Sequence, residues 1–207
     1  MIEDIIIAYN DSKEEESRHF FESCADIIRG KAVASGLKYH NINSNNLKNS
    51  EIETKISSLN SGFIFSAFSH GSKTALHNHE SDEYISTQTN NYIFSGNIIY
   101  TFACECGCDL KEDLEQKGVA SFWGYTKKIN ICPYVDEFII CATEGLVNFI
   151  DGNTLEFSYN RMIEQYNESI NSLYKESFLQ AAFLLENKES LIVSGDKNMT
   201  ISNIGFN

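Results

Sequence analysis

The sequence predicts an α/β fold built on a mostly parallel β-sheet that is sandwiched by helices. Short apolar runs rich in β-branched or aromatic residues recur along the chain, as in strands buried on both faces of a parallel sheet. Between them lie longer segments with apolar residues at helical spacing. The two kinds alternate, which is the order that βαβ units produce. With no repeat and a single proline, residues 1–207 are expected to form one domain.

The first half of the chain is expected to begin with a strand over 5–9, which is apolar throughout. A helix is predicted over 14–29, because aromatic and aliphatic residues recur there every three or four positions and a glycine follows. A second strand is expected over 37–42 and a second helix over 50–59. The third strand, over 63–68, is almost entirely apolar and runs directly into Ser-His-Gly.

The second half is expected to contain two more strands, over 98–103 and 119–123, with an acidic helix over 109–117 between them. Two longer helical patterns follow over 135–149 and 154–186, and the second is expected to break near Ser172. A short C-terminal hairpin is predicted because Gly and Asx residues favour a tight turn. Its two strands are expected at residues 191–194 and 199–201.

Composition narrows the functional classes. The net charge is −13, and no basic cluster exceeds Lys127-Lys128, which argues against nucleic acids and anionic membrane surfaces as partners. No segment approaches the roughly 18 apolar residues of a membrane helix. The N-terminus is acidic, unlike a signal peptide, so we expect a cytoplasmic protein whose six cysteines are reduced thiols.

Two reactive residues stand at the ends of predicted strands. His70 follows the strand over 63–68, and Cys104 follows the strand over 98–103. Ligand crevices of parallel sheets lie at the carboxyl ends of the strands, so we expect the two side chains to meet there. An imidazole can take the thiol proton and later protonate a leaving amine. The backbone N–H groups of Gly71 and Cys104 are expected to form an oxyanion hole.

The sequence resembles the caspase-like peptidase clan, closest to its CHAT and gingipain branches. An apolar strand ending in His70-Gly71 and a second ending in Ala103-Cys104 are the hallmarks, with a Gly195-Asp196 turn behind them. The chain departs from true caspases, because Phe102 replaces the glutamine of their signature and the His–Cys gap is shorter than about 50 residues. The turn proline of the other branches is Lys197 here.

The resemblance implies a cysteine endopeptidase that cleaves a protein substrate and needs no cofactor or metal. It also implies a regulated bacterial stress or defence effector that an activating partner or ligand switches on. Four residues near the expected cleft are candidate substrate contacts, although for the aromatic pair core packing explains the pattern equally well. These residues are Glu105, Trp123, Tyr125 and Asp136.

Three alternatives stay open. Cys104, Cys106 and Cys108 alternate and could bind a metal together with His77 and His79, although structural zinc sites usually show Cys-x₂₋₄-Cys pairs. The chain could also be an inactive, caspase-like adaptor. Finally, its first strand and loop are typical of TIR domains, an NAD-cleaving or adaptor class, but His-Gly and Ala-Cys have no place in that class.

Overall fold

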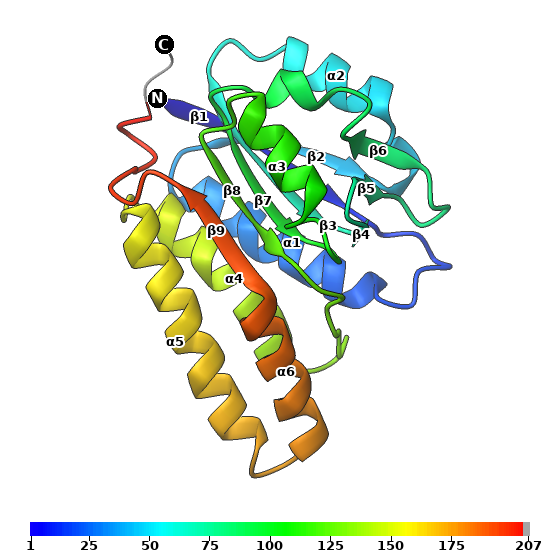
Figure 1. The fold of residues 1–207 in the computed structure, drawn as a ribbon, viewed down its shortest axis with the longest axis vertical. Helices are drawn as coiled ribbons and strands as arrows, with labels where there is room; N and C mark the ends of the chain where they lie inside the picture. Colours follow the sequence, from blue (N-terminus) through cyan, green and yellow to red (C-terminus); the bar gives the residue numbers. More distant parts are fainter. Residues whose placement is uncertain (205–207) are drawn as a thin grey trace.

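A six-stranded sheet forms the centre of the molecule, in the order β2-β1-β3-β7-β8-β9 (Figure 1). The first five of these strands are parallel, and β9 pairs antiparallel with β8 at one edge. The computed structural model describes residues 1–204. The strands are β1 (Ile2–Tyr9), β2 (Lys38–Asn43), β3 (Gly62–Phe68), β7 (Ile98–Phe102), β8 (Ser121–Tyr125) and β9 (Leu191–Gly195).

Helices cover both faces of the sheet, as the sequence predicts (Figure 1). One face packs against α1 (Arg18–Ala34), α4 (Asp136–Ile150), α5 (Leu155–Leu173) and α6 (Phe178–Ser190). The other packs against α2 (Asn49–Ser57) and α3 (Asp109–Gln116), together with the short η2 (Asn91–Phe94). Within residues 1–204, no helix is both long enough and apolar enough to cross a membrane.

A small antiparallel sheet follows β3 directly and was not expected from the sequence. It consists of β4 (His70–Gly71), β5 (Ala75–His77) and β6 (Glu83–Ser86), in that order. Leu76, Tyr84 and Ile85 are fully buried against the α2/α3 side of the main sheet. The two-residue β4 therefore leads the chain from the end of β3 into a packed extension, which fixes its direction at His70. A further short turn, η1 (Ser44–Asn46), follows β2.

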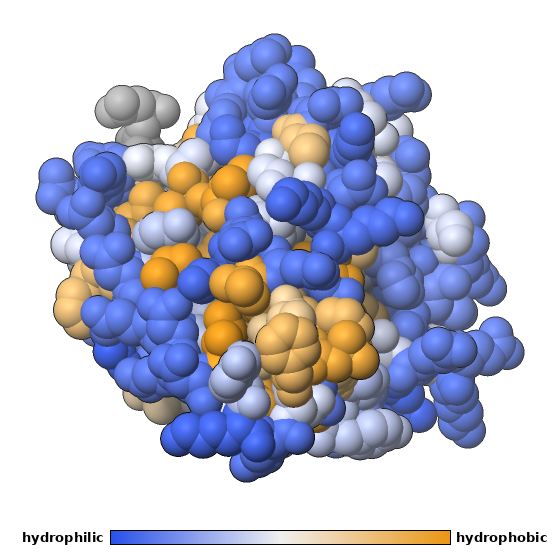
Figure 2. Space-filling model, turned by 60° about the horizontal axis from the view of Figure 1, so that its bottom comes forward, coloured by the Kyte–Doolittle hydropathy of each residue, from blue (hydrophilic) through white to orange (hydrophobic). Residues whose placement is uncertain are grey.

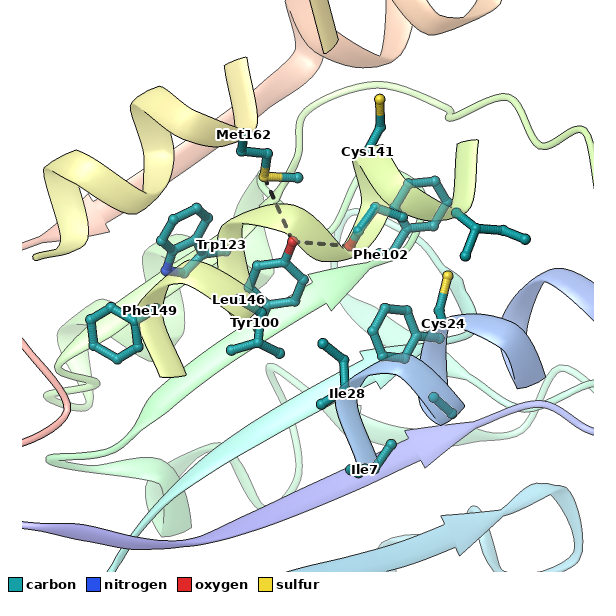
Figure 3. Packing of buried hydrophobic residues seen from close by; sticks show 14 of the residues in the cluster. Ile7, Cys24, Ile28, Tyr100, Phe102, Trp123, Cys141, Leu146, Phe149 and Met162 are labelled. Carbon is teal, nitrogen blue, oxygen red and sulfur yellow. Dashed lines mark hydrogen bonds between the residues drawn. The ribbon is translucent and has the colours of Figure 1, made fainter. Parts of the chain in front are cut away.

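The larger of the two hydrophobic clusters lies between the sheet and α1, α4 and α5 (Figure 3). Tyr100 and Trp123 pack there at a ring distance of 5.4 Å, and burying each such side chain contributes roughly 2–3 kcal/mol. The Tyr100 hydroxyl donates to the Ala142 carbonyl at 3.0 Å, so its polar end is satisfied inside the core. Close packing of this kind holds the sheet edges, and the loops that leave them, in fixed positions.

An apolar patch lies at the end of the molecule where α5 and α6 meet. Figure 2 brings this end forward and shows orange surface among the blue. Tyr174, Phe178 and Leu179 are exposed there. They lie in or beside the break between α5 and α6, which the sequence places near Ser172 and the structure places after Leu173.

The first helix and the C-terminal strands differ most from the sequence expectation. The first helix begins at Arg18, because residues 12–15 form a turn, and it runs past Gly30 to end before Gly36, whose φ is +76°. Near the C-terminus, β9 forms as predicted, but its antiparallel partner is β8, which otherwise would be an exposed edge. Residues 199–201 instead pair with the N-termini of α5 and β1 through single backbone hydrogen bonds.

Candidate active site at the carboxyl edge of the sheet

The ends of β3 and β7 lie side by side. The two strands are parallel neighbours with Phe68 opposite Phe102, and the Ser69 N–H continues the pairing to the Phe102 carbonyl at 3.3 Å. His70 and Cys104, each two residues beyond this last pair, therefore leave the sheet at the same level. The structure thus confirms that the two predicted strands end at one edge of the sheet.

Gly71 brings the two chain segments into direct backbone contact. A β-carbon placed on Gly71 would lie 2.6 Å from the Cys104 carbonyl oxygen and 2.9 Å from the Ala103 Cβ. Real β-carbons do not approach other atoms so closely, so any side chain here would push the two segments apart. The glycine that follows His70 is required by this approach.

Glu15 holds the His70 ring. Its carboxylate oxygen Oε2 lies 2.5 Å from His70 Nε2, although the two residues are 55 positions apart in sequence. The Glu15 side chain is only 6% exposed, whereas that of His70 is 47% exposed. The other carboxylate oxygen accepts the Ser17 N–H at 2.9 Å, just before α1 begins, and Phe21 of α1 meets the imidazole edge-on. The turn before α1 thus presents a fixed carboxylate to an accessible imidazole.

This contact decides which ring nitrogen can act as a base. A carboxylate accepts hydrogen bonds, so Nε2 carries the proton in the neutral ring. The lone pair is then on Nδ1, which is left to exchange a proton with a thiol or a substrate.

The Cys104 thiol is half-buried and accepts the Ile129 N–H at 3.5 Å. Burial raises the pKa of the Cys104 thiol above its ordinary value, and the Ile129 N–H partly offsets this. Cys104 is therefore held as a thiol in this conformation and needs a base to become a nucleophile.

The turn after Cys104 is pinned to the next strand. Glu105 has a left-handed backbone, with φ of 56°, and its N–H donates to the Lys127 carbonyl at 3.0 Å. The Gly107 N–H donates to the Tyr125 carbonyl at 2.9 Å. A left-handed conformation is uncommon outside glycine and is retained where neighbouring contacts impose it. Of the backbone hydrogen bonds within residues 1–204, none uses the Cys104 N–H.

Cys106 and Cys108 support the turn. The Cys106 thiol is buried between the Thr101 hydroxyl at 2.9 Å and the Ala103 carbonyl at 3.2 Å, and burial raises its pKa to about 11. The Cys108 thiol donates to the Thr126 carbonyl at 3.4 Å. In residues 1–204, no three His, Cys, Asp or Glu side chains gather closely enough to hold a metal ion.

The candidate substrate residues lie in different surroundings. Trp123 and Tyr125 are 2% and 1% exposed, and Figure 3 shows Trp123 inside the core near Phe149 and Met162. Both side chains are therefore core residues and do not contact a substrate. Asp136 is exposed at the first turn of α4, in a hollow that it shares with His19 of α1. Glu105 directly follows Cys104 and is partly exposed.

Comparisons with solved structures identify the fold. The crystal structure of the Arg-specific cysteine proteinase gingipain R (RgpB) matches 98% of this chain, with a TM-score of 0.67 and 12% sequence identity. The chain has the fold of gingipain R. A complex of the Porphyromonas gingivalis RgpB pro- and mature domains matches 97% of it, with a TM-score of 0.59 and 14% identity.

The likeness to gingipain R confirms the fold predicted from the strand-end motifs. This chain spans 48% of the length of each gingipain chain. No protein-family model matches the chain, and no curated protein matches it. At 12–14% identity the shared property is the fold, which is that of a known cysteine proteinase.

Sequence reasoning missed Glu15 and Ile129, although both touch the predicted pair. Glu15 is one of four acidic or basic residues in succession, Lys13 to Glu16, and nothing in that run distinguishes it. Ile129 contributes only a backbone N–H, which any residue except proline would supply. The one available signal is position: the residues between the first strand and the first helix also leave the carboxyl edge of the sheet.

Proposed function

We propose that the chain is a cysteine endopeptidase in which Cys104 is the nucleophile and His70 the general base. The observation that carries the proposal is the nearly buried Glu15 carboxylate bound to Nε2 of an exposed histidine, on the strand end that contacts the Cys104 backbone. In the neutral ring this contact places the proton on Nε2 and the lone pair on Nδ1, which is the form a general base needs. The gingipain R fold supports the same reaction class.

The reaction proceeds in two halves. Nδ1 of His70 takes the proton from the Cys104 thiol as the sulfur forms a bond to the substrate carbonyl carbon. The carbonyl oxygen becomes an oxyanion, which the N–H groups of Gly71 and Cys104 bind. The imidazolium returns the proton to the amine as the C–N bond breaks, leaving a thioester on Cys104. Water, deprotonated by the same imidazole, then releases the acid and regenerates the thiol.

We propose a protein substrate with a basic residue near the cleaved bond. Glu105 beside the nucleophile and Asp136 on α4 are the proposed acidic contacts, and the net charge of −13 favours the approach of a basic chain. The solved neighbour with this fold is an Arg-specific proteinase. The resemblance to CHAT peptidases further suggests a regulated bacterial stress or defence effector with an activating partner or ligand.

A positional-scanning peptide library on the purified protein tests the reaction and the preference together. We expect cleavage that is abolished in Cys104→Ala and His70→Ala and retained in Cys106→Ala, whose sulfur is buried. Cleavage that survives Cys104→Ala would remove the proposed nucleophile. No cleavage by the parent, even with cell extract added to supply an activator, would favour the adaptor alternative, and NAD consumption that survives Cys104→Ala would favour the TIR-like one.

A further inference from the structure

The 126–130 segment, which joins β8 to the loop before α4, lies between the Cys104 turn and α6. It has no regular secondary structure, so its backbone groups need partners outside a helix or sheet. Those partners come from both sides. The contacts to α6 hold the segment in place, and the contacts on the other side reach the proposed nucleophile.

On the α6 side, the segment is tied at both of its ends. The Ser190 carbonyl accepts the Thr126 N–H at 2.9 Å and its hydroxyl at 3.2 Å. Asn187 binds both backbone groups of Asn130: its Oδ1 accepts the N–H at 2.8 Å, and its Nδ2 donates to the carbonyl at 2.8 Å. Asn187 is completely buried, so its amide is committed to this single backbone position.

On the other side, the same segment reaches the Cys104 turn at two points. The Lys127 carbonyl accepts the Glu105 N–H at 3.0 Å, and the Ile129 N–H donates to the Cys104 sulfur at 3.5 Å. Ile129 immediately precedes Asn130, the residue that Asn187 binds. Fixing the peptide of Asn130 therefore fixes the direction of the neighbouring N–H.

We propose that Asn187 is a positioning residue for the nucleophile: through Asn130 it holds the Ile129 N–H against the Cys104 sulfur. Nothing in the predicted motifs involves α6, and Asn187 lies more than 80 positions from Cys104 in sequence. The inference rests on the proposed function for its catalytic meaning, but the chain of contacts from α6 to the sulfur is independent of any substrate.

An N–H group directed at a sulfur stabilises the thiolate more than the thiol, because the thiolate is charged. The charged groups around Cys104 act in both directions, because Glu105 raises the pKa of its thiol and Lys128 lowers it. Asn187 does not touch the sulfur, so its removal changes one contribution and leaves these charges in place.

The test is the pH dependence of Cys104 alkylation by iodoacetamide, followed by peptide mass spectrometry so that Cys104 is distinguished from the other five cysteines. In Asn187→Ala we expect the apparent pKa of Cys104 to rise by about one unit, so that alkylation below that pKa slows about tenfold. The control is Asn130→Ala, which removes only the side-chain bond to Glu186 on the surface of α6 and keeps both backbone contacts to Asn187. Its profile is expected to match that of the parent.

If Asn187→Ala does not fold, the uncharged Asn187→Ser, whose side chain is too short to bind both backbone groups of Asn130, carries the test. In the parent itself, the Ile129 amide signal in NMR spectra is expected to shift as Cys104 ionises. A parent-like alkylation profile in a folded Asn187 variant, or an Ile129 amide that ignores the ionisation of Cys104, overturns the inference. Because alkylation needs no substrate, a shifted profile in a chain without peptidase activity would sink the proposed function and leave this inference standing.

Discussion

At the scale of single residues, a carboxylate, an imidazole and a thiol are brought to one edge of the sheet from three different loops. Cys104 is protected from ionising by burial, so its reactivity depends on a base rather than on an intrinsically acidic thiol. His70 can act as that base because Glu15 fixes its tautomer. In the proposed mechanism, Glu15 therefore acts through His70.

Glu15→Gln is expected to lower kcat by about 10²- to 10⁴-fold, the range that general acid–base catalysis supplies, with little change in KM. The glutamine amide can donate to Nε2, which moves the ring proton to Nδ1 and removes the base. The measurement is steady-state hydrolysis of the best library peptide. Glu16→Gln, at the exposed neighbouring position, is the matched control and should behave as the parent. Equal kcat values for the two variants would refute the role of Glu15.

The sequence predicts His70 and Cys104 as candidates because each stands at the end of a largely apolar run that is typical of a buried strand. It could not predict Glu15, because its partner is 55 positions away and the contact depends on how the turn before α1 folds back. It also left Trp123 and Tyr125 undecided, because an aromatic pair after a strand fits a cleft wall and a core equally well. Only the packing of α4 and α5 over them decides in favour of the core.

At the scale of elements, β8 packs against the turn that follows Cys104. Gly124 in this strand faces three side chains: a β-carbon placed there would lie 2.7 Å from Phe122 Cε1, 2.8 Å from Thr101 Oγ1 and 2.9 Å from Cys106 Sγ. Thr101 belongs to β7, and Cys106 belongs to the turn that follows Cys104. A displacement of β8 at Gly124 would therefore also displace the turn that carries Cys104.

Gly124→Ala is expected to destabilise the protein by about 1–3 kcal/mol, because the added methyl group overpacks this contact. Gly30→Ala is the control, since nothing lies within 4 Å of a β-carbon there, inside α1, and alanine favours a helix over glycine by roughly 1 kcal/mol. Urea unfolding measures both effects, and a Gly124→Ala protein as stable as Gly30→Ala would show that the contact can relax.

The strands also show which parts of the fold a local hydrophobic pattern in the sequence can predict. Largely apolar runs predicted β1, β3 and β7 well, because a strand that is buried on both faces needs apolar side chains at nearly every position. β4 and β5 are too short to show a hydrophobic pattern. β9 pairs with β8, although residues 199–201 are nearer to it in sequence. Pairing of that kind is decided by which edge is free, and a local sequence does not contain that information.

At the scale of the whole molecule, buried thiols make the stability of the fold depend on pH at alkaline values. Burial raises the pKa of Cys106 to about 11 and that of Cys141 to about 12, and it raises the pKa of Cys24 well above its ordinary value. In the unfolded chain these thiols ionise near pH 8.5. The folded protein therefore holds protons that the unfolded chain releases, and stability falls as pH rises through this window.

Urea titrations between pH 7 and pH 10.5, under reducing conditions, should show a free energy of unfolding that is constant below about pH 8 and declines above pH 9. Each such thiol contributes a slope of about 1.4 kcal/mol per pH unit while only the unfolded form is ionised. Cys141→Ala is expected to have a shallower decline than the parent. A stability that rises with pH across this range would contradict the burial of the three thiols.

The most direct test of the central claim is covalent trapping by a panel of peptidyl acyloxymethyl ketones, with the modified residue located by tandem mass spectrometry. We predict one adduct, on Cys104, which forms at the parent rate in Cys106→Ala, forms far more slowly in His70→Ala and is lost in Cys104→Ala. An adduct on another cysteine, or equal labelling of the parent and His70→Ala, would contradict the pairing of these two residues.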